Sequence, residues 1–352
     1  IELGVLYRGE RELCFLPLAH AYSCAFNFLV PMAVGAHVYL LGKVPSPKIL
    51  LKAFEEVKPN LILTVPLILE KIYKKMILPQ LSKTTMKVAL NIPLLDSRIY
   101  AQIRKKLVDA FGGRFREVIV GGAAMNEEVT NFLYKIKFPF TIGYGMTECG
   151  PLISYDHNDE YVPGSCGQIL KGIMKVRIDS EDPYNKVGEI QVSGENVMKG
   201  YYKNEEATRQ VIDTEGWLHT GDMATIDEDG NVFIKGRCKN LLLTSSGQNI
   251  YPEEIESKLN NMPYVSESLI ILQQDKLVGL IYPDSDYPDF DEAFAHGLKN
   301  EDIERVMEEN RLELNKQLPA FSQIARFKLY PEEFEKTAKK SIKRFLYQDI
   351  KE

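Results

Sequence analysis

The segment GYGMTECGP, residues 143–151, places an aromatic ring, a hydroxyl and a carboxylate on one short turn that contains glycine. Tyr144 can stack on a planar ring, Thr147 can hydrogen-bond a phosphate oxygen, and Glu148 can bind a hard cation such as magnesium through oxygen. A plain turn after a strand, with its tyrosine buried, explains the same residues. Taken alone, the segment leaves a ligand site and a plain turn as equal alternatives.

Two other glycine-bearing segments give related signals. In GGAAM, residues 121–125, two residues lack a Cβ and let the backbone approach a ligand, but a tight turn between strand and helix looks the same. In GWLHTGD, residues 216–222, the carboxylate of Asp222 can accept hydrogen bonds from both hydroxyls of a ribose. An aspartate that caps its own turn is an equal alternative. His219 stays unassigned, because a single histidine in a turn is more often a hydrogen-bonding partner than a base.

Positive charge gathers in one segment near the C-terminus, EKTAKKSIKR, residues 335–344. Its cations are Lys336, Lys339, Lys340, Lys343 and Arg344. They can meet phosphates, or they can form a solvated helix end. The whole chain carries 43 Lys and Arg against 49 Asp and Glu, a net charge of −6, so we expect no nucleic-acid partner and only a local anion site.

The scaffold that must position these segments can be read from the spacing of apolar residues. From about residue 11 to 155 helical and strand patterns alternate, which predicts an α/β fold with a parallel sheet covered on both faces. Ser46 predicts the start of one helix, Leu61–Val65 a buried strand, and Asn126 the start of another helix. The glycines at 121–122 and 143–145 then follow strands that end at one edge of the sheet, where open α/β sheets bind ligands.

Later parts of the chain have other patterns. Residues 160–236 show short strands punctuated by glycine and no helix, which predicts a small antiparallel β unit. Beyond it, a helix at Pro252–Leu259, a hairpin at Ser268–Ile281 and a helix at Glu301–Lys316 predict an α+β domain. We expect three domains: residues 1–158, an α/β subdomain that is incomplete at its start; residues 159–237, a β subdomain; and residues 238–352, an α+β domain.

Composition gives expectations about the compartment. Five cysteines without close paired spacing argue against a disulfide framework and a C-x-x-C metal site. No stretch approaches the roughly 18 apolar residues that a membrane helix needs, and no basic leader precedes an apolar run. We therefore expect a cytoplasmic protein.

In order along the chain, GYGMTE, GWLHTGD and the Gly-Arg-x-Lys of residues 236–239 with the SGQNIYPEEIE that follows resemble the adenylate-forming superfamily, and within it the long-chain fatty acid CoA ligases. The resemblance runs from about Glu12 to the C-terminus. It implies an AMP-forming acid–thiol ligase with an acyl-CoA synthetase-like fold, in which the C-terminal α+β domain is a mobile lid. A carboxylate would attack the α-phosphate of ATP to form an acyl-adenylate and pyrophosphate, and the thiol of CoA would then displace AMP. The implied partners are a fatty acid, ATP, Mg²⁺ and CoA, and peripheral contact with a membrane stays open.

The resemblance also implies roles for individual residues. Tyr144 and residues 121–123 would hold the adenine, Thr147 the α-phosphate, and Asp222 with Arg237 the ribose. The implied nucleotide-binding residues are Gly121, Gly122, Ala123, Gly143, Tyr144, Gly145, Met146, Thr147, Asp222, Ile234 and Arg237. The implied catalytic residues are His20, Thr147, Glu148 and Lys340, and Glu148 is also the implied metal ligand. Lys239 matches the hinge of the lid, and Ser246, Gly247 and Gln248 match the wall of the CoA tunnel.

The sequence departs from the family pattern at two places. The phosphate-binding loop of the family, which ends in Lys-Gly, should lie just upstream of Leu13, and residues 1–12 do not match it. We therefore expect this chain to be the C-terminal part of a longer enzyme and not to complete the reaction by itself. At the tail, alignment on Ile342 puts Ser341 where the family has its adenylation lysine, so Lys340, one residue earlier, is the candidate.

The substrate class depends on the segment between Glu12 and Glu55, which contains no Asp or Glu. Its first part is apolar, with Phe15, Leu18, Ala21, Phe26, Phe28, Leu29 and Val30. It fits an apolar acyl chain and offers no acid for a substrate ammonium, although a buried packing helix would look the same. Aryl and medium-chain acids stay open. The alternatives to a fatty acid CoA ligase are adenylation of another carboxylate with transfer to a carrier-protein thiol, and a non-catalytic nucleotide-binding fragment.

Overall fold

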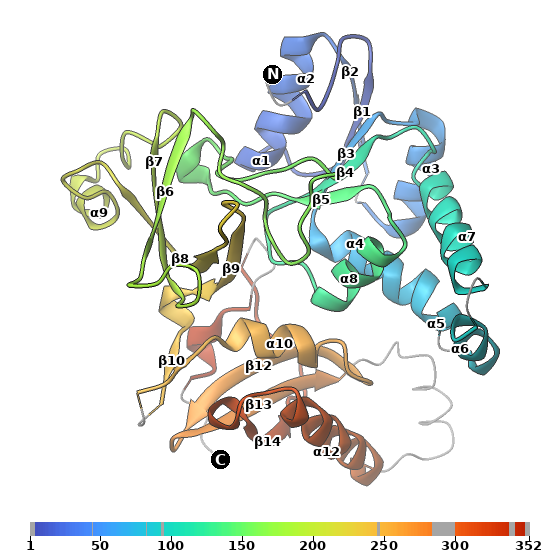
Figure 1. Cartoon of the computed structure of the whole chain (residues 1–352), viewed down its shortest axis with the longest axis vertical. Helices are drawn as coiled ribbons and strands as arrows, with labels where there is room; N and C mark the ends of the chain where they lie inside the picture. Colours follow the sequence, from blue (N-terminus) through green and yellow to red (C-terminus); the bar gives the residue numbers. More distant parts are fainter. Residues whose placement is uncertain are drawn as a thin grey trace. The chain divides into compact units, whose positions relative to one another are not determined.

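The computed structural model describes residues 4–43, 45–81, 83–92, 95–244, 247–283, 300–337 and 342–348. The chain divides into two compact units, residues 1–220 with 224–234 and residues 221–223 with 235–352 (Figure 1). The division at residues 158 and 237 that the sequence predicts stays a prediction. Within the described ranges, no helix is long and apolar enough to cross a membrane.

A sheet of five parallel strands, in the order β2-β1-β3-β4-β5, is the centre of the first unit (Figure 1). Its strands are β1 (Arg11–Cys14), β2 (His37–Leu40), β3 (Leu61–Thr64), β4 (Glu117–Val120) and β5 (Phe140–Ile142). The α-helices between and after them are α1 (Ala21–Ser23), α2 (Val30–Val34), α3 (Pro47–Val57), α4 (Pro66–Ile72), α5 (Leu78–Leu81), α6 (Thr84–Leu90), α7 (Leu95–Ala110) and α8 (Glu127–Lys135). Two π-helical segments, Cys24–Leu29 and Tyr73–Ile77, continue α1 and α4. The predicted parallel α/β fold is confirmed.

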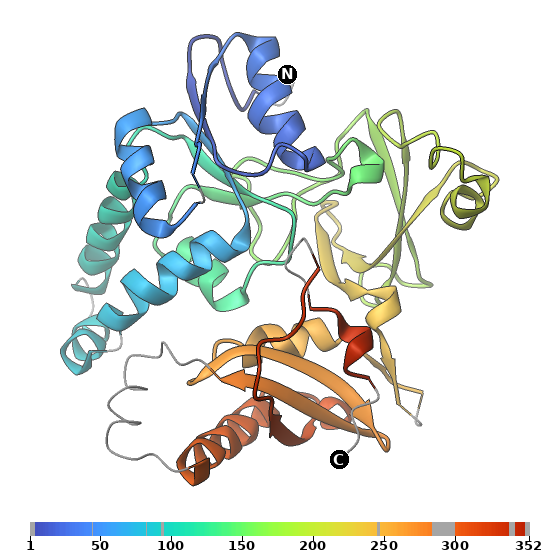
Figure 2. The ribbon, with the colours of Figure 1, turned by 180° about the vertical axis from the view of Figure 1, so that it is seen from behind.

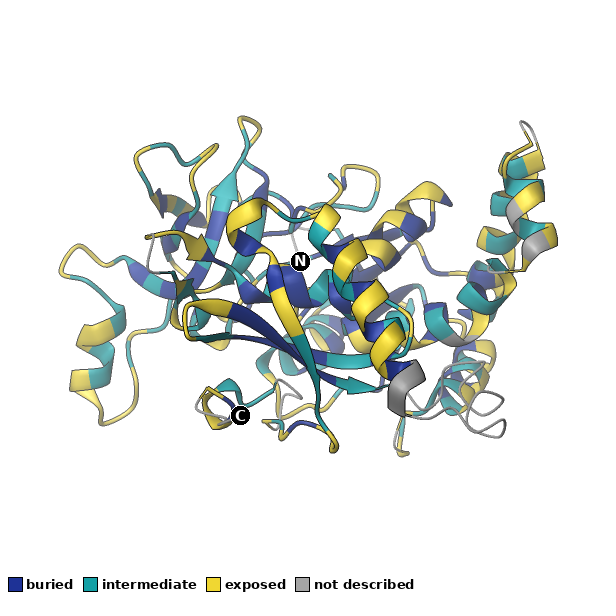
Figure 3. Cartoon of the chain, turned by 90° about the horizontal axis from the view of Figure 1, so that it is seen from below, coloured by how far each residue is buried: buried dark blue, intermediate teal, exposed yellow. Residues whose placement is uncertain are grey.

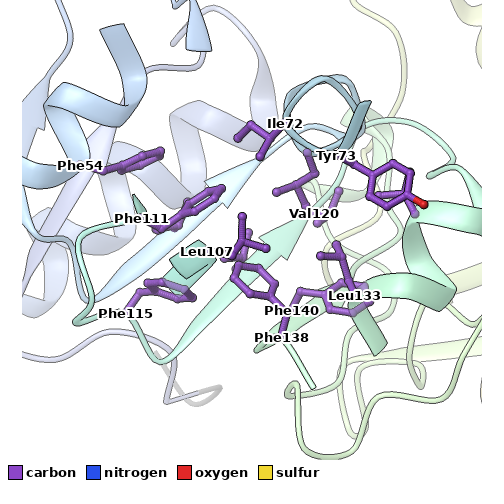
Figure 4. Packing of buried hydrophobic residues seen from close by; sticks show 14 of the residues in the cluster. Phe54, Ile72, Tyr73, Leu107, Phe111, Phe115, Val120, Leu133, Phe138 and Phe140 are labelled. Carbon is purple, nitrogen blue, oxygen red and sulfur yellow. The ribbon is translucent and has the colours of Figure 1, made fainter. Parts of the chain in front are cut away.

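Aromatic side chains fill the core between this sheet and its helices (Figure 4). The Phe54 ring of α3 stacks on the Phe111 ring at a centroid distance of 5.1 Å, and Phe138 meets Phe111 at 5.8 Å. Phe54 and Phe111 are fully buried. Each such ring pair adds roughly 0.5–1.5 kcal/mol to the burial of its apolar surface. The core therefore holds β4 and β5, which carry the glycine turns, in fixed register.

The helix starts that the sequence predicts are formed by side-chain caps. The Ser46 hydroxyl accepts a hydrogen bond from the backbone N–H of Ile49 at 3.4 Å, and the side-chain Oδ1 of Asn126 accepts one from the backbone N–H of Val129 at 3.2 Å. Such caps satisfy N–H groups that have no partner inside the helix. Both predicted starts are confirmed.

The antiparallel sheet of the middle part has the strand order β6-β7-β8-β9. Its strands are β6 (Met174–Asp179), β7 (Gly188–Gly194), β8 (Leu218–Ile226) and β9 (Val232–Arg237). The prediction that this part contains no helix is wrong, because α9 (Glu205–Val211) lies between β7 and β8. Asn204 caps it by accepting from the N–H of Ala207 at 3.1 Å. No side chain of α9 is buried, so it lacks the apolar periodicity that would have revealed it.

Within the described residues, the second unit contains a three-stranded sheet in the order β12-β13-β14 and the two α-helices α10 and α12 (Figure 2). Its elements are β10 (Leu242–Leu243), β11 (Asn249–Ile250), α10 (Pro252–Leu259), β12 (Val265–Gln273), β13 (Lys276–Pro283), α12 (Asn300–Lys316) and β14 (Ile324–Leu329). The predicted helices and hairpin of this α+β part are confirmed. Buried residues gather on strands and inner helix faces, and exposed residues mark outer helix faces and loops (Figure 3).

Candidate active site

Two turns follow adjacent strands at the carboxyl edge of the parallel sheet. Val120 at the end of β4 and Ile142 at the end of β5 are register partners. The N–H of Gly143 donates to the Val120 carbonyl at 2.9 Å. The turns that begin at Gly121 and Gly143 therefore start side by side, as the sequence predicts for this sheet edge.

Packing within the protein requires glycine at position 145 and leaves little room for a side chain at position 121. A Cβ on Gly145 would lie 1.9 Å from the carbonyl oxygen of Pro151, so another residue would force the backbone to move. A Cβ on Gly121 would lie 3.2 Å from the ring of Tyr22. The contact with Pro151 explains the absent side chain of Gly145, so this glycine by itself does not indicate a ligand.

The second turn forms a closed loop with one exposed segment. The N–H of Tyr144 donates to the carbonyl of Ser154 at 3.0 Å and closes the loop. Inside it lies a 3₁₀ turn, Thr147–Cys149. Cys149 is fully buried, whereas Thr147 is exposed. The loop is thus anchored through its cysteine and presents the threonine hydroxyl to solvent, where it can meet a phosphate oxygen.

Glu148, between these two residues, carries the carboxylate of the turn. Its Oε1 accepts a hydrogen bond from the hydroxyl of Tyr201 at 2.9 Å, and the side chain is partly exposed. The pKa of Tyr201 is raised, mainly by burial and to a smaller extent by the nearby Glu148 carboxylate. The phenol therefore stays protonated and donates the hydrogen bond. Mg²⁺ is usually held by one or two carboxylates together with substrate phosphates and waters, and this accessible carboxylate fits that role. The described residues contain no cluster of three or more His, Cys, Asp or Glu that would form an all-protein metal site.

Sequence reasoning missed the residues that hold this turn from the segment after β7. Asn196 donates from its amide to the carbonyls of Cys149 and Leu152 at 2.8 and 2.7 Å. The N–H of Met198 donates to the carbonyl of Glu148 at 2.7 Å. Tyr201 lies 53 positions from Glu148 along the chain, so no local spacing signals the contact.

His20 precedes the helical stretch that follows β1. It is exposed, its backbone is extended at φ −89° and ψ 135°, and its side chain does not cap the helix. Because β1 is parallel to β3 and β4, its carboxyl end lies at the edge that carries the glycine turns. Tyr22, two residues later, donates to the Ile119 carbonyl at 3.1 Å, which places this segment beside the Gly121 turn. The structure thus brings His20 to the predicted sheet edge, and its catalytic role stays a prediction.

A buried carboxyl lies beneath the same helical stretch. Glu12 on β1 is fully buried, and its Oε1 accepts a hydrogen bond from the Asn27 side chain at 2.6 Å. Burial raises the pKa of Glu12 to about 8, only partly offset by that hydrogen bond. The carboxyl is therefore mostly protonated near neutral pH and supplies no anion to pair with a substrate ammonium.

Asp222 and Arg237, the predicted ribose-binding pair, form an ion pair within the second unit. Asp222 is 5% exposed, and its Oδ1 lies 2.8 Å from Nε of Arg237. Gly221 before it has φ +71°, a left-handed conformation that favours glycine. Ile234, in the first unit, packs against an apolar cluster of that unit. The roles of these residues toward a ribose stay predictions.

The predicted lid residues lie in the second unit on two turns. Lys239 is exposed in a 3₁₀ turn, Cys238–Asn240, just after the boundary between the units at residues 234 and 235. Gly247, with φ +78°, and Gln248 belong to the turn between β10 and β11, where the N–H of Gln248 donates to the Thr244 hydroxyl at 3.1 Å. Ser246 and Lys340 lie outside the described residues.

The described cations of the basic tail, in residues 335–337 and 342–344, are paired with acidic side chains. Lys336 and Ile342 form an isolated antiparallel bridge. Lys336 pairs with Glu267 and Glu333, Lys343 pairs with Glu335, and Arg344 pairs with Glu256 and Glu253. Lys339 lies outside the described residues. Acidic side chains thus pair the described cations of this tail, and a role of the tail toward phosphates stays a prediction.

Comparison of the sequence with known proteins identifies the family to which the chain belongs. The sequence profile of the AMP-binding enzyme family matches residues 3–202, and that of the AMP-binding enzyme C-terminal domain matches residues 239–349. A long-chain-fatty-acid–CoA ligase of Saccharomyces cerevisiae is 29% identical over 296 residues, 78% of this chain and 42% of the yeast protein. A 4-coumarate–CoA ligase of Narcissus pseudonarcissus is 31% identical over 280 residues, 76% of this chain and 45% of the plant protein. The chain thus spans about half the length of these relatives.

Solved structures share the fold. ATP-bound MatB from Rhodopseudomonas palustris matches 99% of this chain and 62% of its own with a TM-score of 0.72 and 23% identity. O-succinylbenzoate coenzyme A synthetase from Bacillus subtilis, in complex with AMP, matches 99% of this chain and 62% of its own with a TM-score of 0.72 and 21% identity. At this identity the likeness establishes the acyl-CoA synthetase-like fold.

Proposed function

The chain belongs to the AMP-binding enzymes, and from this premise we propose that it serves ATP-dependent activation of a carboxylic acid and transfer of the acyl group to CoA. In the first step a carboxylate oxygen bonds to the α-phosphorus of ATP while the bond to pyrophosphate breaks. In the second step the CoA sulfur bonds to the acyl carbon, and AMP leaves with the electron pair of the broken C–O bond. The carrying observation is the Gly143–Ser154 loop, which presents Thr147 and Glu148 at the ligand-binding edge of a parallel sheet.

The residues of this loop stabilise charge and need no nucleophile. The Thr147 hydroxyl is exposed and donates to an α-phosphate oxygen, where negative charge spreads during the first step. Glu148 holds the Mg²⁺, which supplies neutralising positive charge to the phosphate oxygens when bound. Tyr144 and the backbone of residues 121–123 form the adenine surface, and His20 acts beside the reacting carboxylate.

Residues of the second unit serve the second step in this proposal. Asp222 with Arg237 binds the ribose hydroxyls, since a carboxylate accepts from a diol and the ion pair with the arginine fixes its orientation. Lys239 is the hinge about which the second unit rotates between the two steps. Gly247 and Gln248 line the path of CoA.

For the substrate, we propose a long-chain fatty acid. The stretch from Ala21 to Val34 adds no acid, and Glu12 beneath it is mostly protonated, so neither favours an amino acid. The fatty acid ligase of yeast supports this substrate. An aromatic acid is the second candidate, because the 4-coumarate ligase of Narcissus is similar to this chain to the same degree.

Calorimetric titration with non-hydrolysable acyl-adenylate analogues tests the proposal. The series runs from acetyl to palmitoyl and includes a coumaroyl analogue. An apolar acyl tunnel would raise affinity by up to ~0.8 kcal/mol per added methylene. Tightest binding of the coumaroyl analogue would favour the aromatic acid, and affinity that does not change with acyl group would remove the fatty acid. Absence of binding throughout would contradict an adenylate site in this chain.

The acyl acceptor is tested separately. Pre-formed acyl-adenylate is offered with CoA or with a phosphopantetheinyl carrier protein, and thioester formation is measured. The proposal expects thioester with CoA. Formation of a thioester with the carrier protein but not with CoA would mean that the acyl acceptor is a carrier-protein thiol.

A further inference from the structure

We propose that Tyr201 is a positioning residue for Glu148, holding one carboxylate oxygen so that the other is presented to the divalent cation that accompanies the nucleotide. The inference rests on the proposed function, because ATP brings that cation. Tyr201 touches neither the nucleotide nor the cation in this arrangement. It acts through Glu148.

The contact has the geometry of a charge-assisted hydrogen bond. The Tyr201 hydroxyl lies 2.9 Å from Oε1 of Glu148, and a phenol donates strongly to a carboxylate. Within the part of the chain that the structure describes, Tyr201 is the one side chain that bonds this carboxylate, through Oε1. The second oxygen, Oε2, is thereby left for a ligand.

Tyr201 is itself held in place from α9. Its backbone N–H donates to the Thr208 hydroxyl at 2.9 Å, and that hydroxyl donates to the Asn204 carbonyl at 2.9 Å. Gly200 permits the close approach, since a Cβ there would lie 2.8 Å from the methyl carbon of Thr208. The helix that sequence patterning missed therefore has an identifiable role, which is to fix the tyrosine that meets Glu148.

The backbone of the same segment fixes the other side of the contact. Met198 donates to the Glu148 carbonyl and Asn196 to the carbonyls of Cys149 and Leu152. These hydrogen bonds hold the backbone of Glu148 in place independently of its side chain. What the tyrosine adds is the orientation of the carboxylate, which otherwise rotates between several rotamers. Partners that orient a metal ligand typically change metal affinity 10–100-fold.

Binding of Mn²⁺ in the presence of a non-hydrolysable ATP analogue, followed by the electron paramagnetic resonance of free Mn²⁺, tests the proposal without turnover. We expect Tyr201→Phe to weaken Mn²⁺ binding about 10-fold. Tyr202→Phe is the matched control, because Tyr202 is 88% exposed and its ring contacts the Lys203 ammonium. This control should bind Mn²⁺ as the unsubstituted chain does.

Two further measurements separate orientation from a general loss of structure. Affinity for an acyl-adenylate analogue without metal should be unchanged in Tyr201→Phe, whereas damage to the turn would weaken it. In a Glu148→Gln background, which keeps an acceptor for the tyrosine and loses the charge, Tyr201→Phe should cause no additional loss of Mn²⁺ binding. An equal loss in both backgrounds, or full Mn²⁺ affinity in Tyr201→Phe, would overturn the proposal. Absence of Mn²⁺ binding by the unsubstituted chain would instead refute the proposed function, and this inference with it.

Discussion

At the amino edge of the parallel sheet, Glu117 begins β4 and is 3% exposed, whereas at the carboxyl edge Glu148 follows β5 and is partly exposed. Glu117 accepts from the hydroxyl of Tyr155 at 2.7 Å and from the backbone and side chain of Asn158 at 3.1 and 3.4 Å, and His157 lies 3.3 Å away. Among the residues that the structure describes, the carboxylate of Glu148 accepts from one side chain, Tyr201.

The different number of hydrogen-bond donors around Glu117 and Glu148 indicates a structural role for the first carboxylate and a binding role for the second. A buried carboxylate that is surrounded by donors stabilises the fold and has no capacity left for a ligand. A partly exposed carboxylate with one oxygen anchored is oriented and still able to bind. The number of donors around each carboxylate, and not the residue type, therefore distinguishes the two edges.

The largest effect is expected from Gly145→Ala, which tests how far the carboxyl edge depends on backbone packing. The new Cβ would lie 1.9 Å from the Pro151 carbonyl oxygen, so the loop must distort. We expect the free energy of unfolding of the first unit to fall by at least about 3 kcal/mol in denaturant titration. Gly143→Ala is the matched control, because its Cβ would meet nothing closer than 3.5 Å. Equal stability of the two variants would contradict this account of the turn.

Glu117→Ala should destabilise the amino edge of the parallel sheet. Removal of the carboxylate leaves the Tyr155 hydroxyl and the Asn158 N–H without their acceptor in a buried place. We expect a loss of about 3 kcal/mol in the free energy of unfolding, with binding of an adenylate analogue unchanged in the folded fraction. A loss of binding without a loss of stability would show that the amino edge also takes a ligand.

Glu12 extends the comparison, since it is buried like Glu117 but, among the described residues, accepts a hydrogen bond from Asn27 alone. Its folded-state pKa of about 8 lies above its ordinary value of 4.5, so the native state binds more protons and stability falls as pH rises between these values. Glu12→Gln keeps the acceptor and removes the titration. We expect unfolding measured between pH 5 and 8 to show a slope smaller by on the order of 1 kcal/mol per pH unit in this variant. An unchanged slope would show that Glu12 is already ionised in the folded chain.

The smallest effect on stability is expected from Glu148→Gln. The glutamine still accepts from Tyr201, so the free energy of unfolding should change by less than about 0.5 kcal/mol. Mn²⁺ binding with a non-hydrolysable ATP analogue should nevertheless weaken at least about 10-fold, because the charged ligand is gone. A large loss of stability with unchanged Mn²⁺ binding would show that Glu148 stabilises the fold and does not bind the metal.

Prediction from sequence was most successful where one short segment contains the whole signal. Ser46 and Asn126 cap helices a few residues away, so residue type and position determine the outcome. The glycine turns at 121 and 143 could be placed at one edge because parallel strands align their carboxyl ends. The helix α9 was missed because a short helix without a buried face leaves no apolar pattern, although Asn204 carries the same capping signal as Asn126.

The amino-acid sequence was sufficient to assign the α/β class, the family and the segments that bear Thr147 and Glu148, because each of these depends on residues that are close together along the chain. Which carboxylates have all their hydrogen-bonding capacity used, and which charges are neutralised, became evident from the folded chain. Glu117 meets Tyr155 at a separation of 38 positions, Glu148 meets Tyr201 at 53, and Arg344 meets Glu256 at 88. Hydrogen bonds and burial act through space, so the chemical capacity of these side chains exists only once the fold has brought their partners together.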